Sequence, residues 1–170
     1  MIIGGAYKGK LYRALNPVYA KQPLSGEGAK RYGGRFNPRG IPALYCSLSI
    51  LTAIREANQA GTLQPTTLVS YDAAIDAVFD STSPAALQSE HLDMGMLAAN
   101  SWRDEMNAKG EAQTQSIARI LMSKSYNGLL IRSFAPGATD EDLNLVLWRW
   151  TSASPTRLTL IDDEGRLSSS

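Results

Sequence analysis

Three side chains between Gly33 and Glu56 have the types needed to handle a phosphorylated, cationic ligand. Arg35 offers a guanidinium that can bind a phosphate through two parallel hydrogen bonds. Tyr45 offers an aromatic face to a cationic ring, and Glu56 offers a carboxylate. In the stretch GGRFNPRGIPALYCSLSILTAIRE, a glycine pair and an Asn-Pro turn precede a short apolar run and a helix. We interpret the three side chains as parts of one pocket.

The strand predicted at residues 42–48 carries Tyr45 away from the core, because alternate side chains of a strand point to opposite faces. Cys46 lies on the core side of this strand, and we interpret it as a small buried apolar residue rather than a nucleophile. The expected core side is Leu44, Cys46 and Leu48, and the other side is Ala43, Tyr45 and Ser47.

Ser49 is expected to cap a helix that runs to about Gln59 and ends before Gly61. Its predicted apolar stripe has Glu56 at the edge, one turn after Thr52. A single helical glutamate is ordinarily exposed to solvent, so Glu56 alone identifies no site. The residues of the stripe are Ile50, Ala53, Ile54 and Ala57.

The remaining patterns predict an α+β fold, with a mixed, mostly antiparallel sheet and flanking helices in a single domain over residues 1–170. Residues 18–40 are expected to form an irregular loop, whose glycines match neither the dinucleotide-binding nor the P-loop motif. Residues 91–112 give the least readable pattern, although Met94, Met96, Leu97, Trp102 and Met106 suggest helical packing and are interpreted as core residues. Further strands are expected at 10–15, 66–71, 77–79, 128–132, 143–150 and 157–161. Further helices are expected at 84–90 after Ser83, and from 114 or 115 to 125 with Ile117, Ala118, Ile120 and Leu121 on one face.

Composition narrows the classes of function. The chain has 170 residues, of which 44% are hydrophobic and 19% charged, an ordinary globular balance. A single cysteine, Cys46, and a single histidine, His91, argue against a disulfide framework, a zinc site and a His-dependent triad. The N-terminus does not resemble a signal peptide and no apolar run is long enough for a membrane span, so we expect a cytoplasmic protein without a metal site.

Charge is spread unevenly, although its sum is only +1. Before Gly40 there are eight lysines and arginines against the single acid Glu27, whereas residues 72–105 hold seven acids against Arg103. The basic quarter predicts either a face for an anionic ligand or partner, or a solvated surface. Tyrosines interleaved with these cations leave single-stranded nucleic-acid binding open.

Several stretches together resemble the RES domain, the toxin half of RES–Xre toxin–antitoxin pairs. They are LYRAL at 11–15, PLSGEGAKRYGGRFNPRGIPALYCS at 23–47, Glu56, GLLIRSFAPG at 128–137 and NLVLWRW at 144–150. The resemblance implies an ADP-ribosyltransferase-like fold and cleavage of the nicotinamide–ribose bond of NAD⁺, by hydrolysis or phosphorolysis. It implies NAD⁺ as substrate, no prosthetic group, and no contact with a membrane. Its implied partner is an Xre-family helix-turn-helix antitoxin, so that DNA is met only indirectly.

The resemblance also implies roles for individual residues. Arg35 would grip the pyrophosphate, Tyr45 would stack on nicotinamide, and Glu56 would face the oxocarbenium-like transition state. Ser133 would hydrogen-bond the ribose or the carboxamide. The other substrate contacts that the resemblance implies are Arg13, Gly34, Asn37 and Asn144. Two alternatives stay open: transfer of ADP-ribose to a protein, and a non-catalytic module that binds anions or nucleic acid.

Overall fold

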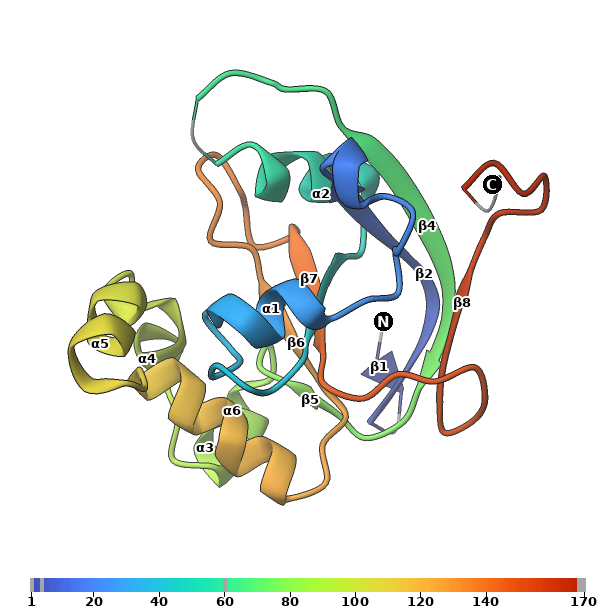
Figure 1. Ribbon diagram of the computed structural model, residues 1–170. Coiled ribbons are helices and arrows are strands. Elements are labelled where there is room, and N and C mark those ends of the chain that lie inside the picture. Colours follow the sequence, from blue (N-terminus) through green and yellow to red (C-terminus); the bar gives the residue numbers. More distant parts are fainter. Residues whose placement is uncertain (1, 4, 60, 168–170) are drawn as a thin grey trace.

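The computed structural model of the chain describes residues 2–3, 5–59 and 61–167. In this part of the chain, a strongly curved sheet of eight strands is flanked by short helices (Figure 1). The strands are β1 Ile2–Ile3, β2 Ala6–Leu15, β3 Leu44–Ser47, β4 Thr67–Ile75, β5 Val78–Asp80, β6 Gly128–Arg132, β7 Leu143–Leu147 and β8 Thr156–Leu160. The helices are the 3-10 turn η1 Pro17–Tyr19, then α1 Glu27–Tyr32, α2 Ile50–Ala57, α3 Pro84–Ser89, α4 Met94–Ala98, α5 Trp102–Lys109 and α6 Gln113–Ser123.

The sheet runs in the order β5-β6-β7-β3-β2-β4-β8, with β1 paired to β2 outside this path. The pair β5–β6 is parallel and the other strand pairs are antiparallel. This confirms the predicted α+β class with a mixed, mostly antiparallel sheet. Strand β7 comes late in the chain but lies between β6 and β3, so it joins the two parts of the sheet.

Alternation along the central strands feeds two hydrophobic cores. On one face, Leu145 and Leu147 of β7 pack with Cys46 of β3 and with residues of β2, β4 and β8. On the other face, Val146 of β7 packs against Ile117 and other residues of α6. Both faces of β7 are therefore buried, as its continuous apolar run predicted. Helices α3 to α6 gather on one side of the molecule, whereas α2 lies against β2 and β3 (Figure 1).

Two sequence predictions about helices were confirmed by their caps. The Ser49 hydroxyl accepts a hydrogen bond from the Thr52 N–H at 3.1 Å, where the helix α2 begins. The Ser83 hydroxyl does the same for the Ala86 N–H at 3.3 Å, at the start of α3. None of the described helices is long and apolar enough to cross a membrane.

Other predictions about helices were wrong. The expected loop at 18–40 contains η1 and the short helix α1, which has no side-chain cap and buries no residue. The apolar stripe of α2 was misjudged, because Ile50 and Ala57 are exposed while Thr52 is buried. In α6, Ile120 is exposed and the polar Gln115 is fully buried instead. In both helices, buried polar side chains make hydrogen bonds that no apolar residue could replace.

Candidate active site

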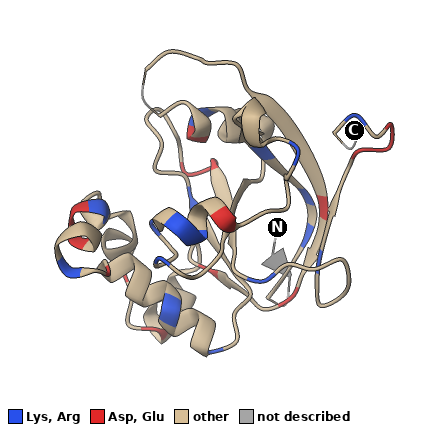
Figure 2. Ribbon diagram, in the orientation of Figure 1, with Lys and Arg blue, Asp and Glu red and all other residues tan. Residues whose placement is uncertain are grey.

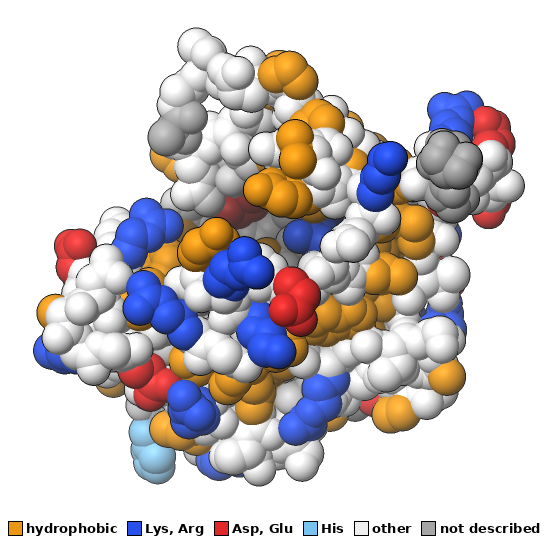
Figure 3. Space-filling view, in the orientation of Figure 1, with side chains coloured by type: hydrophobic (Ala, Val, Ile, Leu, Met, Phe, Trp, Pro, Cys, Tyr) orange, Lys and Arg blue, Asp and Glu red, His pale blue; other side chains and the backbone are white. Residues whose placement is uncertain are grey.

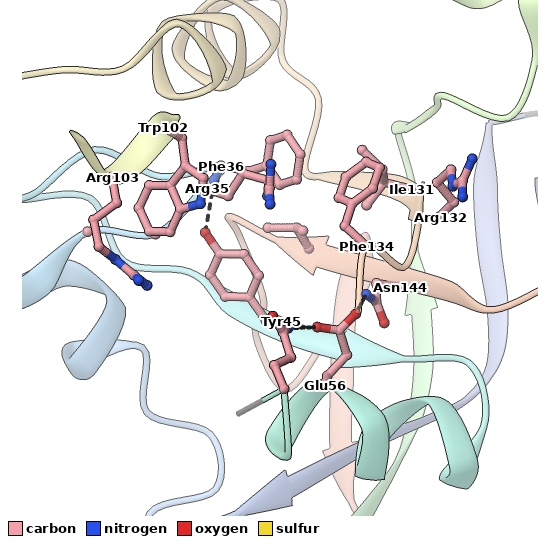
Figure 4. Close-up of a pocket in the computed structure, with 14 residues that line it drawn as sticks. Arg35, Phe36, Tyr45, Glu56, Trp102, Arg103, Ile131, Arg132, Phe134 and Asn144 are labelled. Carbon is pink, nitrogen blue, oxygen red and sulfur yellow. Dashed lines mark hydrogen bonds between the residues drawn. The ribbon is translucent and has the colours of Figure 1, made fainter. Parts of the chain in front are cut away.

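A cavity of about 310 Å³ opens between α2, the turn at residues 33–36, and the start of α5 (Figure 4). Arg35, Tyr45 and Glu56 all line it, so the structure brings together the three side chains with which the sequence reading began. In the space-filling view, a hollow lies beneath α2, with lysine and arginine side chains gathered on the surrounding surface (Figure 3). Helix α1 contributes Lys30 and Arg31 to this basic surface (Figure 2).

The Glu56 carboxylate is held by donors from three elements. The Ser133 hydroxyl and the Asn144 amide Nδ2, the latter at 2.6 Å, both donate to Oε1. Gln59 Nε2 donates to Oε2 at 2.6 Å. Hydrogen bonds from three directions fix the orientation of the carboxylate. Oε2 lies on the more accessible side, because Gln59 is exposed whereas Ser133 is buried.

Strand register sets the orientation of the Asn144 amide. Asn144 of β7 pairs with Ser47 of β3, and the Ser47 hydroxyl donates to Asn144 Oδ1 at 2.7 Å. Because Oδ1 is engaged in this way, the Nδ2 donor faces Glu56. The helix that carries Glu56 is itself fastened, since Thr52 and Arg55 both donate to Asp142 Oδ1, at 2.7 and 2.8 Å.

Tyr45 presents its ring, rather than its hydroxyl, to the cavity. The hydroxyl donates to Asn37 Oδ1 at 2.5 Å and accepts from the Phe36 N–H at 3.1 Å. Burial raises the pKa of Tyr45 well above its usual range, so the phenol stays protonated near neutral pH. Gly34 makes this approach possible, because a Cβ there would lie 2.6 Å from Asn37 Oδ1 and would collide with the Tyr45 hydroxyl.

The turn that carries Arg35 is braced from inside the protein. Asn37 is fully buried, and its Nδ2 donates to the carbonyls of Ala29 and Ile41 at 2.8 and 2.9 Å. Gln115 of α6 donates through Nε2 to the carbonyls of Gly34 and Asn37, at 2.9 and 3.2 Å. Neither Asn37 nor Gln115 is among the cavity-lining residues. These amides set the backbone that presents Arg35 and Tyr45.

Both terminal nitrogens of the Arg35 guanidinium donate hydrogen bonds to other parts of the protein. Its NH1 donates to the Ala99 carbonyl at 2.7 Å and reaches the Leu97 carbonyl at 3.5 Å, and its NH2 donates to Asn100 Oδ1 at 3.4 Å. The guanidinium carbon lies 4.8 Å from the centroid of the Phe134 ring. Burial is the main cause that lowers the pKa of Arg35, and the Glu56 charge opposes it. Arg35 thus fastens the α4–α5 connection to the turn.

The sequence-predicted residues divide by position. Gly34 and Asn144 line the cavity together with Arg35, Tyr45 and Glu56. Ser133, with 1% of its surface exposed, lies behind the Glu56 carboxylate and not on the cavity wall. Arg13 does not line this cavity but an adjoining hollow of about 280 Å³, which shares Tyr45 and Glu56 with it, and the Arg13 NH1 donates to the Pro23 carbonyl at 3.0 Å. The roles in substrate binding that the resemblance implies stay predictions for each of them.

Sequence reasoning missed several residues of the cavity wall. Trp102 and Arg103, at the start of α5, line it opposite Phe134 (Figure 4). Trp102 was predicted as a core residue, but it is only partly buried and lines the cavity. Phe134 directly follows Ser133 in the SFAPG stretch, and this adjacency was the one available signal.

Comparison with known protein families identifies the family of the chain. Residues 10–169 match the RES domain family. The chain belongs to the RES domain family. Among curated proteins, "Toxin Res" from Photorhabdus laumondii is 44% identical over 46 residues, which are 27% of this chain and 30% of that protein. "NAD(+) phosphorylase MbcT" from Mycobacterium tuberculosis is 32% identical over 93 residues, which are 48% of this chain and 50% of that protein.

A solved structure shares the fold of this RES domain. The crystal structure of the M. tuberculosis MbcT–MbcA toxin–antitoxin complex contains a chain that aligns with a TM-score of 0.65 and 23% identity. The alignment covers 92% of this chain and 82% of that one. The similarity to the curated relatives in sequence spans half of their length or less.

Proposed function

We propose that this RES domain is an NAD⁺-cleaving toxin enzyme that breaks the bond between nicotinamide and ribose. The observation that carries the proposal is the Glu56 carboxylate, held by Ser133, Asn144 and Gln59 at the wall of a cavity that Tyr45 and Arg35 share. The carboxylate suits the ribose on which positive charge develops, the aromatic ring suits the nicotinamide, and the guanidinium groups suit the pyrophosphate of NAD⁺.

The chemistry fits these residue types. When the C1′–N bond breaks, its electron pair moves to the nicotinamide nitrogen and neutralises the pyridinium ring, while positive charge develops on the ribose. A carboxylate oriented in advance stabilises that charge without reorganising. Glu56 Oε2 has the direction to accept a hydrogen bond from a ribose hydroxyl, in the place that Gln59 now occupies. The oxygen of phosphate, or of water that gives up a proton to the solvent, then bonds to C1′.

Tyr45 and Phe134 would receive the nicotinamide ring. Both rings line the cavity, and the Tyr45 hydroxyl is engaged with Asn37 and Phe36, which leaves its face for stacking. The attraction of a cationic ring to an aromatic face is lost once nicotinamide leaves as a neutral molecule, which favours product release.

A protein partner forms part of the proposal. The solved relative is a toxin–antitoxin complex, and two curated relatives are named a toxin and an NAD(+) phosphorylase. We expect an antitoxin of the Xre helix-turn-helix type to neutralise this chain by covering the cavity, in the cytoplasm where NAD⁺ is available. Copurification of the chain with the product of a neighbouring gene, and loss of NAD⁺ cleavage in that complex, would support this.

Product analysis tests the activity directly. Purified protein is incubated with NAD⁺, with and without inorganic phosphate, and nicotinamide is quantified. Phosphorolysis yields ADP-ribose 1″-phosphate only when phosphate is present, hydrolysis yields ADP-ribose in both cases, and transfer leaves label from radioactive NAD⁺ on protein. Absence of nicotinamide release would exclude the proposed activity.

Glu56→Gln links the activity to the site. The amide is isosteric, its oxygen can still accept from Ser133 and Asn144, and the exposed Gln59 can turn its amide to accept the new N–H. We therefore expect an intact fold and a loss of about 10²–10⁴-fold in kcat, the range for a charge or proton acceptor at the reacting centre. A variant with wild-type kcat would remove Glu56 from the mechanism.

A further inference from the structure

Arg35, which the resemblance assigns to the pyrophosphate, is only partly available for binding phosphate. In the structure Arg35 NH1 is engaged with two backbone carbonyls and NH2 with the Asn100 side chain. A phosphate at this guanidinium would have to replace hydrogen bonds that hold the α4–α5 connection. A second cation would allow a ligand with two phosphates to bind while these hydrogen bonds stay in place.

Arg103 meets that need. It lines the same cavity from the first turn of α5, its side chain is exposed, and its guanidinium carbon lies 4.8 Å from the centroid of the Trp102 ring. Within residues 2–3, 5–59 and 61–167, no carboxylate forms an ion pair with Arg103. Its donors are free to bind an anion that enters the cavity.

The charge around the cavity is favourable for phosphate. Three arginines line it, Arg35, Arg103 and Arg132, against the single carboxylate of Glu56. Arg132 is partly neutralised by Asp140, at 3.2 Å from its NH1. Arg103 and Arg35 face the same space closely enough that the Arg103 charge contributes to the lowered pKa of Arg35. Such repulsion between two cations is relieved when an anion binds between them.

The size of the cavity indicates which part of NAD⁺ lies at Arg103. About 310 Å³ is at the lower end of the roughly 300–1,000 Å³ of ligand pockets and encloses one half of a dinucleotide, so the other half must extend past the exposed Arg103 at the rim. Glu56 and Tyr45 occupy one side, where the nicotinamide ribose is expected. Trp102 and Arg103 lie on the opposite side from Phe134 and Asn144 (Figure 4).

We infer that Trp102 and Arg103 form the subsite for the adenosine diphosphate half of the dinucleotide. Arg103 binds the pyrophosphate through its planar fork of donors, and the Trp102 ring gives the adenine a surface for stacking. Arg35 positions this subsite by fastening the residues that precede α5. The inference rests on the proposed function for the identity of the ligand.

Inorganic phosphate, the acceptor in phosphorolysis, presents the same chemistry to an arginine. The pyrophosphate is favoured because the arginine here lies beside an aromatic ring, which a nucleotide uses and a free phosphate does not. The two sources are separated by measuring the binding of ADP, which has no nicotinamide, and the dependence of the reaction rate on phosphate concentration.

The test compares Arg103→Ala with Lys109→Ala. Lys109 is an exposed cation at the other end of α5 and does not line the cavity, so its removal controls for the loss of one charge from this helix. Binding of ADP by calorimetry needs no turnover. We expect Arg103→Ala to weaken ADP binding by about 10- to 100-fold, the loss of charge-assisted hydrogen bonds, and Lys109→Ala to leave it unchanged. The KM for NAD⁺ should rise by a similar factor at unchanged kcat.

The outcomes separate the two proposals. No ADP binding by the wild type, or equal binding by Arg103→Ala, overturns the subsite. A KM for phosphate that rises in Arg103→Ala while ADP binding is unchanged assigns Arg103 to the acceptor and also overturns it. ADP binding that depends on Arg103, in a protein that releases no nicotinamide from NAD⁺, supports the subsite and refutes the proposed enzyme.

Discussion

Two different roles are open to Ser133: it could bind the substrate, or it could position the Glu56 carboxylate. The resemblance to the RES family predicts a contact between Ser133 and the ribose or the carboxamide. In the structure its hydroxyl is buried and donates to Glu56 Oε1. We therefore expect Ser133→Ala to lower kcat through a displaced Glu56, with the KM for NAD⁺ nearly unchanged.

The magnitude follows from the hydrogen bonds that are lost and kept. Glu56 loses one of three donors, and a hydrogen bond to a charged group contributes about 1.5–3 kcal/mol. Asn144 and Gln59 still hold the carboxylate, each at 2.6 Å, so it shifts rather than leaves. A displacement on the order of 1 Å at a reacting centre can cost roughly 10²-fold in rate. We expect kcat to fall by about 10- to 100-fold.

A buried serine elsewhere provides the matched control. Ser81 is also 1% exposed, and its hydroxyl donates to the Leu130 carbonyl at 2.6 Å on the neighbouring strand β6. Ser81→Ala should lower the free energy of unfolding by about 0.5–1.5 kcal/mol, and Ser133→Ala by at least as much, because each removes one of two hydrogen bonds to an acceptor that keeps its other donor. Only Ser133→Ala should also lower kcat, measured by nicotinamide release under saturating NAD⁺.

The split between kcat and KM decides the role of Ser133. A rise in KM at unchanged kcat would show that Ser133 binds substrate, as the resemblance implied. Equal kinetics of Ser133→Ala, Ser81→Ala and the wild type would refute both roles and leave Ser133 a structural residue.

Three further predictions concern stability and reactivity. Gly34→Ala should destabilise the fold by about 1–3 kcal/mol, because the new Cβ would collide with the Tyr45 hydroxyl. Gly28→Ala, in open space on α1, should instead stabilise the fold by about 0.5–1 kcal/mol. Denaturant titration measures both changes. Burial raises the pKa of the Cys46 thiol to about 12, so a thiol reagent at about pH 8 should modify it only after unfolding. The Thr139 N–H, with the Thr52 hydroxyl, holds the pKa of Asp142 below its usual range. The ionised Asp142 carboxylate should therefore stabilise the fold above about pH 4, its pKa in the unfolded chain, and this stabilisation should be lost as the pH falls through the lower pKa of the folded state. Asp142→Asn should remove this part of the dependence of stability on acid, measured by denaturant titration at several pH values.

Each of these has a result that contradicts it. Equal stability of the two glycine variants would mean that the turn at residue 34 can open to admit a methyl group. Rapid labelling of Cys46 in the native protein would show that its strand separates from the core. Identical acid dependence in Asp142→Asn and the wild type would leave no role for this carboxylate in fastening α2.

Local patterns predicted much of the fold, because the central strands and the helix caps are encoded by neighbouring residues. The apolar run at 128–132 became β6 with the predicted bounds, and Ser49 and Ser83 cap helices as expected. Helix α1 escaped prediction, since it has six residues, an internal glycine and no buried face. Exposure of Ile50 and Ile120 could not be foreseen, because it depends on which neighbours cover each helix.

For the candidate site, the sequence predicted which types of residue take part, but not which side chains are hydrogen-bonded to one another. Arg35, Tyr45 and Glu56 lie within one stretch, and a strand followed by a capped helix brings them to one cavity. Ser133 meets Glu56 across 77 residues of sequence, a contact that only the strand order creates. Arg103 was hidden because α5 has a mixed surface and begins in a section without hydrophobic period. Neither the spacing of residues in the sequence nor the composition predicts which of these distant residues come into contact.

The late position of β7 in the chain has a consequence for synthesis. The ribosome makes the chain from the N-terminus onward, and β7 must enter between β3, which was made long before it, and β6, which directly precedes it in the sequence. Until residues 143–147 have emerged, Glu56 has no Asn144 beside it and the two parts of the sheet are unjoined. The growing chain therefore completes its carboxylate site only after residue 144 has been made, 88 residues after Glu56. If the proposed partner binds the finished cavity, it can meet the domain close to the moment at which the proposed active site is assembled.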